Sequence, residues 1–338
     1  MVEYPTRKIG VDDVSAIGFG AMVLSAFYGQ TDPDEECLKV LDKAYELGCT
    51  FWDTASVYGD NEELIGKWFK LNPEKRSKIF LATKFGIKSV GVVDGSPRNV
   101  YESFAKSQRL LGVDRVELFY LHRPDPQTPI EETVGAMAEL VKQGKVKYLG
   151  LSECSADTMR RAQKVHPIAA AQVEYSPFTL DIEDPKFNIL STARELGIKI
   201  IAYSPLGRGL ITGRYKSPDD FESKDFRRTI PRYSKENFPN ILKLADDVKR
   251  VGERYNATAG QVALAWLLAQ GDDVIPIPGT KKIKYLEENL GAINVSLSPE
   301  SVQEVRMIAE KADGVIGDRY APASMKGLYA ETPLPKSA

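Results

Sequence analysis

The sequence contains few of the side chains that hold metal ions. Its 338 residues include only two histidines, His122 and His166, and three cysteines, none of them in a Cys-x-x-Cys pair. Neither a His-Glu-x-x-His motif nor a Cys/His cluster is present, so we expect no metal site. Three cysteines without regular spacing do not make a disulfide framework either, which favours a reducing, cytoplasmic location.

The sequence also lacks an excess of charge and a long apolar run. There are 45 Lys and Arg against 47 Asp and Glu, a formal net charge of −2, so we expect neither nucleic acid nor an anionic membrane as partner. The most apolar stretches, such as residues 262–269, are far shorter than the roughly 20 residues that cross a bilayer. An acid and a proline within residues 1–8 stand where a secretory signal would have its apolar core. These features favour a protein that acts on a small molecule and leave its oligomeric state open.

What the sequence does contain is an alternation of short β-type runs with amphipathic helical segments. The expected strands are 16–20, 50–53, 79–84, 116–122, 148–152, 169–175, 199–204 and 274–278. The expected helices are 34–47, 63–69, 98–111, 130–142, 156–165, 185–196 and 259–270. Eight strands that alternate with helices are typical of an α/β protein with a (β/α)8 TIM barrel, which we predict as a single domain over 1–338. An open doubly wound sheet is the alternative.

Three segments fall outside this repeat. Residues 6–14 predict a short N-terminal hairpin that turns at Gly10 and covers the bottom of the barrel. Residues 210–240 are an insertion after the seventh strand, and residues 313–338 are a C-terminal tail with little periodicity. Because long loops in barrels carry specificity, we expect the last two segments to select the substrate.

Four polar side chains are expected together at one end of the barrel. Asp53, Lys84 and His122 end the second, third and fourth predicted strands, and Tyr58 follows in the loop after Asp53. In TIM barrels, the carboxyl ends of the strands and the loops that follow them carry the catalytic groups. Each residue alone has an ordinary structural explanation, such as a capping aspartate or a core histidine. Together they predict a charged cluster with a catalytic purpose.

These residue types suit the proton transfer of carbonyl reduction. Tyrosine has a pKa of about 10, and we expect a cationic Lys84 nearby to lower the pKa of Tyr58. Asp53 would hold the Lys84 ammonium group in an ion pair, and His122 would donate a hydrogen bond to the substrate carbonyl. Tyr58 would then be the general acid for a carbonyl that becomes an alkoxide.

The motifs around these residues resemble those of the aldo-keto reductase superfamily, over nearly the whole chain. FWDTASVYGDNEELIG (51–66) is similar to the signature around the catalytic Asp and Tyr, LATK (81–84) to the segment of the Lys, and LFYLH (118–122) to that of the His. The resemblance implies NADPH-dependent reduction of aldehydes or ketones, with NADH as an alternative cofactor. It also implies a catalytic tetrad of Asp53, Tyr58, Lys84 and His122.

Two further segments resemble one branch of this superfamily. LGLSE (149–153) and VEYSPF (173–178) look most like the pyridoxal reductases and the plant alkaloid-aldehyde reductases. We therefore expect a small-molecule carbonyl compound as substrate.

The nicotinamide cofactor needs a site other than a Rossmann fingerprint, because Val23 stands where Gly18-Phe-Gly20 would need a third glycine. We predict that this site follows the seventh strand, where Tyr203 would stack on the nicotinamide ring. The residues after it would offer backbone N–H groups and a guanidinium to the pyrophosphate; they are Ser204, Leu206, Gly207, Arg208 and Gly209.

The eighth strand leads into Gly279, Thr280 and Lys281, just before a helix begins, which is a suitable place for an anion. The resemblance implies that this stretch binds the adenosine end with its 2′-phosphate. It further assigns Glu288 and Asn289 to the adenine.

The resemblance also assigns Ser152 and Gln172 to the nicotinamide carboxamide. This chain departs from many relatives at two positions. Tyr285 replaces an arginine, so Lys281 or Lys282 would take over the phosphate, and Glu153 replaces an asparagine beside Ser152.

The aromatic residues expected to line the acceptor pocket are Tyr28, Trp52, Phe85 and Tyr320. Two alternatives to a reductase stay open at this point. One is a nicotinamide-binding redox sensor that resembles the potassium-channel β subunits. The other is a barrel enzyme that uses Lys84 to form a Schiff base with its substrate.

Overall fold

An eight-stranded parallel sheet forms the centre of the computed structural model, which describes residues 3–313 and 317–336. In spatial order its strands are β12 (Val274–Pro276), β11 (Lys199–Tyr203), β10 (Ile168–Glu174), β9 (Val146–Ser152), β8 (Val116–Leu121), β5 (Phe80–Phe85), β4 (Phe51–Asp53) and β3 (Phe19–Gly20). Gly18 donates its backbone N–H to the Pro276 carbonyl at 2.9 Å, and Gly20 donates to the Pro278 carbonyl at 3.1 Å. These bonds join the first strand to the last and close the predicted barrel, so the open-sheet alternative is wrong.

The closing seam explains the Gly18-Phe-Gly20 sequence. A Cβ atom on Gly20 would lie 2.7 Å from the carbonyl oxygen of Ile277, and one on Gly279 would lie 2.4 Å from that of Gly20. Two backbone segments approach each other here more closely than any side chain allows. These glycines therefore serve barrel closure.

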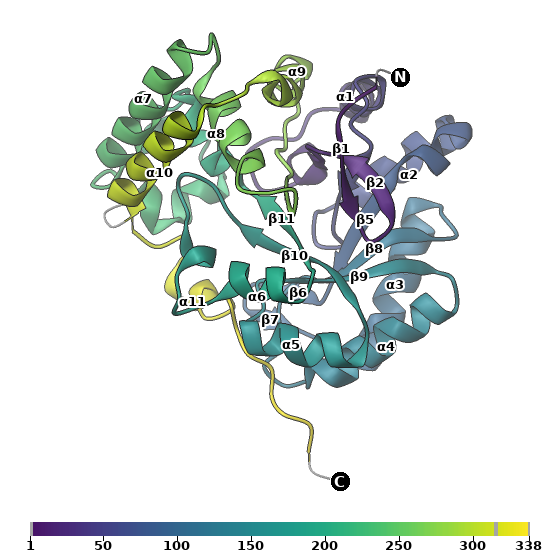
Figure 1. Ribbon diagram of the computed structural model, residues 1–338. Helices are drawn as coiled ribbons and strands as arrows, with labels where there is room; N and C mark the ends of the chain where they lie inside the picture. Colours follow the sequence, from purple (N-terminus) through teal and green to yellow (C-terminus); the bar gives the residue numbers. More distant parts are fainter. Residues whose placement is uncertain (1–2, 314–316, 337–338) are drawn as a thin grey trace.

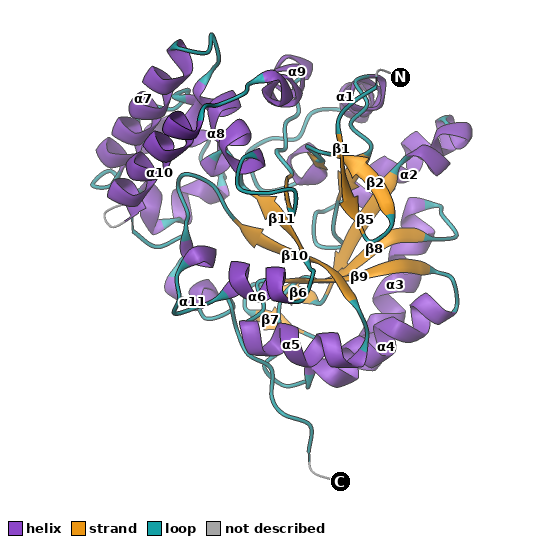
Figure 2. Cartoon of the chain, viewed as in Figure 1, coloured by secondary structure: helices purple, strands orange, loops and turns teal. Residues whose placement is uncertain are grey.

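Helices surround the strands, as Figures 1 and 2 show. They are α1 (Asp34–Glu46), α2 (Asn61–Leu71), α3 (Pro97–Leu111), α4 (Ile130–Lys142), α5 (Ala156–Val165), α6 (Ile189–Glu195), α7 (Phe238–Glu253), α8 (Ala259–Leu268), α9 (Ile283–Gly291), α10 (Pro299–Asp313) and α11 (Pro322–Met325). The sequence predicted α1 to α6 and α8, and a helix after Lys281 that corresponds to α9, but it did not predict α7, α10 or α11. α7 packs against α8, and α10 packs against α7, on the outside of the barrel (Figure 1).

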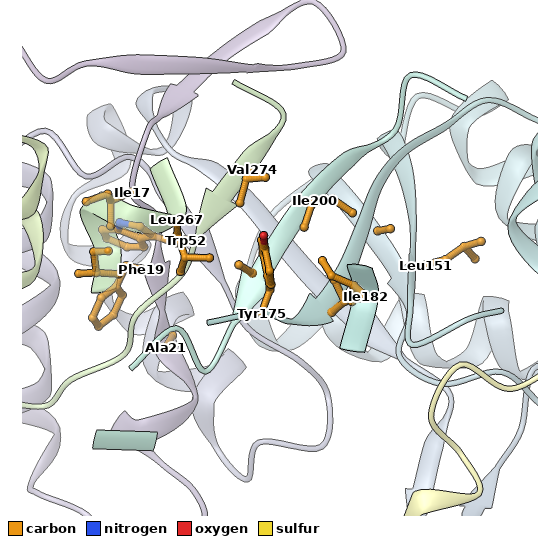
Figure 3. Packing of buried hydrophobic residues seen from close by; sticks show 14 of the residues in the cluster. Ile17, Phe19, Ala21, Trp52, Leu151, Tyr175, Ile182, Ile200, Leu267 and Val274 are labelled. Carbon is orange, nitrogen blue, oxygen red and sulfur yellow. The ribbon is translucent and has the colours of Figure 1, made fainter. Parts of the chain in front are cut away.

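Two apolar clusters follow from the alternation of side chains along the strands. Phe51, Ile201 and Ile275 belong to the smaller cluster, which fills the barrel interior. Their neighbours on the other face, such as Trp52 and Ile200, belong to the larger cluster between strands and helices (Figure 3). Since successive strand residues point to opposite faces, one step along a strand moves a side chain from one cluster to the other.

The three segments outside the repeat take the expected places. β1 (Thr6–Ile9) and β2 (Asp12–Ser15) form the predicted hairpin with Gly10 at φ +58°, and Val11 N–H donates to the Tyr148 hydroxyl near the amino end of β9. The insertion forms short 3₁₀ turns between Gly207–Thr212 and Pro231–Tyr233 before α7 begins. In the tail, Ala330 forms a parallel bridge with Cys154; residues 314–316 and 337–338 of the predicted tail lie outside the described residues. A second hairpin, β6 (Ile87–Ser89) with β7 (Val92–Val93), follows β5.

Candidate active site

Three neighbouring strands bring the polar side chains together. Asp53 ends β4, Lys84 is the penultimate residue of β5, and His122 directly follows β8. The backbone N–H of His122 donates to the Phe85 carbonyl at 2.8 Å, which fixes His122 at the level of Lys84. The loop after β4 is held to β5 by a bond from Ser56 N–H to the Lys84 carbonyl, and Tyr58 lies in this loop. The carboxyl ends of parallel strands share one edge of the sheet, so residues up to 69 positions apart converge there.

The Lys84 ammonium group is the centre of the cluster. It donates hydrogen bonds to the Asp53 carboxylate, to the Thr54 carbonyl at 2.8 Å and to the Tyr58 hydroxyl at 3.5 Å. An ammonium group has three N–H donors, and these contacts use all three. The Lys84 side chain is fully buried and Asp53 is 2% exposed, so the ion pair is shielded from water.

Two more contacts orient the cluster. The other Asp53 carboxylate oxygen accepts a hydrogen bond from the Gln172 amide at 2.8 Å. The His122 ring meets the Tyr58 ring edge to face, with centroids 5.7 Å apart. Asp53, Tyr58, Lys84 and His122 thus lie together, as the sequence predicts.

Burial controls the proton affinities of the site. It raises the pKa of the Tyr58 phenol; the Asp53 carboxylate adds to the rise, and the Arg123 guanidinium opposes it. The pKa of Tyr58 is therefore raised overall, whereas the sequence led us to expect a lowered value. The cost of placing a phenolate in a dry site exceeds the attraction of the nearby cations.

The other members of the cluster are affected in the same way. Burial lowers the pKa of His122 well below its ordinary value, with help from the positive charges of Lys84 and Arg123. The imidazole is therefore neutral near pH 7 and keeps one N–H donor. Burial also raises the pKa of Asp53 and lowers that of Lys84, and in each case the charge of the partner opposes the shift.

The residues assigned to the carboxamide lie next to the cluster. Ser152 ends β9 and pairs in register with Gln172 on β10, and both are buried. Glu153, which replaces the asparagine of many relatives, is fully buried, and its Oε2 atom has no hydrogen-bond partner among the described residues. A buried acceptor without a donor is costly, so such an atom is suited to accept an N–H from a ligand. A nicotinamide carboxamide offers such an N–H, so the residues present fit this group.

The segment after β11 is the one predicted to bind the nicotinamide ring and the pyrophosphate. Tyr203 is the last residue of β11 and is half-buried; Ser204 and Leu206 follow it in the loop. The next three residues, Gly207, Arg208 and Gly209, all have positive φ. The contact of Arg208 with the pyrophosphate stays a prediction, but the Arg208 guanidinium has a partner inside the protein. It turns inward to the Glu174 carboxylate at 3.3 Å, because that buried acid at the end of β10 needs a positive charge.

At the predicted adenosine end, two lysines share one acid. The Lys282 ammonium lies 2.9 Å from the Asp32 carboxylate and the Lys281 ammonium 3.9 Å from it. Thr280 accepts a hydrogen bond from the Lys282 N–H, just before α9 begins. Arg214 from the insertion lies over the ring of Tyr285 at 6.0 Å, which adds a third cation at this end.

The residues assigned to the adenine lie on α9. The Glu288 carboxylate accepts a hydrogen bond from the Thr258 hydroxyl at the start of α8, and Asn289 is buried beside it. Gly279 precedes this helix in the closing seam.

Two of the four aromatic residues predicted for the acceptor pocket belong to the core. Trp52 packs on Trp68 with ring centroids 4.7 Å apart, and Phe85 stacks on Phe119 at 4.9 Å, and both are fully buried. The prediction for these two residues is corrected, since each is the strand neighbour of a catalytic candidate and so faces the helices instead of the barrel. Tyr320 does lie near the site.

A series of aromatic rings leads from Tyr58 to Tyr320. Phe27 meets Tyr58 edge to face at 6.1 Å, Phe226 meets Phe27 at 5.9 Å, and Tyr320 meets Phe226 at 6.3 Å. The rings come from the loop after β3, from the insertion and from the tail. Tyr28, also in the loop after β3, packs under the Arg227 guanidinium at 4.9 Å.

Sequence reasoning missed several of these residues. Arg123 donates to the His122 carbonyl at 2.7 Å and to the Ser152 hydroxyl at 3.1 Å, and its place directly after His122 was the signal that could have found it. Phe226 lies in the insertion, which has no periodicity, so no pattern pointed to it. The same holds for Arg319 of the tail, whose guanidinium lies 3.0 Å from the Glu153 carboxylate.

Comparisons with known proteins agree with the fold. The model of the Aldo/keto reductase family matches residues 16–310. The chain is 63% identical to Aldo-keto reductase str7 of Strobilurus tenacellus, over 94% of this chain and 95% of that protein. It is 50% identical to Aldo-keto reductase yakc of Schizosaccharomyces pombe, whose name specifies NADP(+), over 98% and 99%.

Solved structures are similar as well. The glycerol dehydrogenase AKR11B4 from Gluconobacter oxydans has a TM-score of 0.81 at 28% identity, with 94% of this chain and 98% of that chain covered. The thermostable aldo-keto reductase Tm1743 has a TM-score of 0.73 at 28% identity, with 91% and 100% covered.

The closed (β/α)8 barrel and these relatives together define the class of this protein, which is an NADP-dependent oxidoreductase that reduces carbonyl compounds. The chain belongs to the aldo-keto reductase family. Within residues 3–313 and 317–336, no helix has the length and apolar character needed to span a membrane. The branch within the family and the cytoplasmic location stay predictions.

Proposed function

We propose that this protein reduces aldehydes or ketones to alcohols with Tyr58 as the proton donor. The observation that supports this most is the Lys84 ammonium group, which is fully buried, paired with Asp53 and 3.5 Å from the Tyr58 hydroxyl oxygen. Such a cation has little effect on the neutral phenol but stabilises the phenolate that proton donation creates.

NADPH, when bound, supplies a hydride to the carbonyl carbon. His122 is neutral and donates its N–H to the carbonyl oxygen, which holds the substrate beside the phenol. The oxygen becomes an alkoxide, a stronger base than phenolate, and takes the Tyr58 proton even though burial raises the pKa of that phenol. Lys84 then donates its hydrogen bond to a phenolate, and Asp53 keeps Lys84 charged.

The chain's own residues would hold the cofactor at three places. Ser152, Gln172 and Glu153 suit the carboxamide, and Tyr203 suits the face of the nicotinamide ring. Backbone N–H groups of the segment 204–209 suit the pyrophosphate. Lys281 and Lys282 suit a 2′-phosphate, which favours NADPH over NADH.

The two alternatives have less support. A Schiff base needs a neutral amine with a free lone pair, whereas all three N–H groups of Lys84 have acceptors. A redox sensor would bind NADPH without rapid turnover, so an assay of NADPH oxidation distinguishes it from a reductase.

The test is NADPH and NADH oxidation by the wild-type protein with a benzaldehyde, a short aliphatic aldehyde, pyridoxal and a sugar. We expect oxidation with at least one aldehyde. Tyr58→Phe should keep its fold and its affinity for NADPH while kcat falls about 10²–10⁴-fold. Unchanged turnover in Tyr58→Phe would remove Tyr58 from the mechanism, and NADPH binding without any turnover by the wild-type protein would favour the sensor.

A further inference from the structure

A buried set of charges ties the C-terminal segment to the strand ends next to Ser152. The Arg319 side chain is 1% exposed, and its guanidinium lies 3.0 Å from the Glu153 carboxylate, 3.6 Å from that of Glu174 and 3.3 Å from that of Asp181. It also donates to the Tyr329 hydroxyl at 2.6 Å. These groups are shielded from water, unlike a surface ion pair, so the loss of one partner would leave an uncompensated charge inside the protein.

Glu153 is the acid that depends most on this arginine. Glu174 has a second cation, Arg208, at 3.3 Å. Among the described residues, Arg319 is the only positively charged group that forms an ion pair with Glu153. Without Arg319, the buried carboxylate of Glu153 would have no counter-charge in contact with it.

The contacts of Glu153 lead directly to Tyr203. The Oε1 atom of Glu153 accepts hydrogen bonds from the Tyr203 hydroxyl at 2.7 Å, from the Glu174 backbone N–H at 3.2 Å and from Arg319. The Tyr203 hydroxyl also lies 3.2 Å from the hydroxyl of Tyr320, the residue after Arg319. Two adjacent residues of the tail therefore fix both Glu153 and the ring of Tyr203.

The second carboxylate oxygen of Glu153, Oε2, is an acceptor that the protein leaves without a donor. It is buried and has no hydrogen-bond partner among the described residues, although Glu153 directly follows Ser152 in the chain. Because Oε1 is occupied by three donors, the carboxylate cannot turn to use Oε2 inside the protein without breaking them. The backbone of Glu153 itself has φ +54°, a conformation that non-glycine residues rarely adopt.

We propose that Arg319 is a positioning residue for the nicotinamide end of the cofactor, which it serves by holding Glu153 and, through Glu153, the Tyr203 ring. This inference rests on the proposed function, because that function places nicotinamide at Ser152 and Tyr203. By linkage, the cofactor in turn stabilises the docked tail.

The experiment compares Arg319→Gln with Arg319→Lys and with a control that also loosens the tail. Arg161→Gln is the matched control, since Arg161 pairs with Glu131 and donates to the carbonyls of Thr332 and Pro333, away from Glu153. The Kd for NADPH is measured by cofactor fluorescence. We expect it to rise at least tenfold in Arg319→Gln, less in Arg319→Lys and less than threefold in Arg161→Gln.

A second readout does not depend on affinity. In the wild-type protein, NADP(+) should slow hydrogen exchange of the backbone amides in residues 317–332, and this protection should be lost in Arg319→Gln but kept in Arg161→Gln. The double variant Glu153→Gln/Arg319→Gln removes both charges of the pair. It should bind NADPH more tightly than Arg319→Gln. If Arg319→Gln does not fold, Arg319→Lys is the test variant, and a Kd for NADPH equal to that of the wild-type protein would overturn the proposal.

The outcomes separate the two proposals. Equal NADPH affinity in Arg319→Gln and wild type, or equal losses in Arg319→Gln and Arg161→Gln, would overturn the positioning role and leave the reductase intact. A double variant no better than Arg319→Gln would also contradict it, because then Glu153 is not the residue through which Arg319 acts. A wild-type protein that binds no NADPH would overturn the proposed function itself.

Discussion

The Lys84 ammonium group lies 3.5 Å from the hydroxyl oxygen of Tyr58, and both side chains are shielded from water. The two residues come from β5 and from the loop after β4, and only barrel geometry brings them together. This cation donates to an oxygen that is neutral in the resting protein and negative after proton donation. The arrangement is therefore prepared for the charge that develops during the reaction.

The pH dependence of reduction tests the protonation state of Tyr58. Only the protonated phenol of Tyr58 can donate a proton, and this form is lost only as the pH rises through the pKa of Tyr58. Because burial raises this pKa above the ordinary value of about 10, we expect kcat/KM for an aldehyde to stay constant between about pH 7 and pH 9. A tenfold fall over this range at a fixed, saturating NADPH concentration would contradict a buried, protonated Tyr58.

The pH dependence of stability tests the neutral state of His122. Burial lowers its pKa in the folded protein, so below the ordinary value of about 6.5 the unfolded chain binds a proton that the folded protein does not. Stability from this group is thus present above pH 6.5 and is lost as the pH falls. Between about pH 7.5 and pH 5.5 the wild-type protein should lose about 1 kcal/mol more unfolding free energy than His122→Asn. Urea denaturation of both proteins at the two pH values measures this; equal losses would mean that folding does not lower the pKa of His122.

Asp32 is expected to weaken the preference for NADPH, because it occupies the two lysines assigned to the 2′-phosphate. Asp32→Asn should tighten NADPH binding about threefold, and Lys282→Ala should weaken it about tenfold. Neither change should alter NADH binding. The control is Lys284→Ala, which removes an exposed lysine of α9 and should leave both affinities unchanged. Parallel shifts for NADPH and NADH would place these residues away from the 2′-phosphate.

The two sets of aromatic residues should separate stability from substrate binding. Trp52→Phe removes a hydrogen bond from the indole N–H to the Cys49 carbonyl and leaves space beside Trp68, so it should cost about 2 kcal/mol of unfolding free energy. Its KM for an aromatic aldehyde should not change. Phe226→Ala should do the reverse and raise this KM about tenfold with little effect on stability, since its ring is only partly buried. A KM that responds to Trp52→Phe would restore Trp52 to the acceptor pocket.

The sequence alone determined the barrel and the identity of the cluster. Alternating apolar runs specify strands and helices by local periodicity, and Asp53, Lys84 and His122 stand where three strands end. The hydrophobic period of a strand or helix and the residue at which it ends are local properties, so both can be recognised in the sequence alone. The same periodicity already implied that Trp52 and Phe85 face the helices, although the aromatic character of these residues favoured the pocket.

Only the tertiary structure decided which charges meet. Arg208 pairs with Glu174, Arg319 reaches Glu153 from 166 positions away, and burial reverses the expected direction of the Tyr58 pKa shift. Ion pairs depend on distances across the fold, and desolvation depends on the exclusion of water. Neither quantity leaves a regular pattern in the sequence. The core was therefore predictable from pattern, whereas the electrostatics of the site were not.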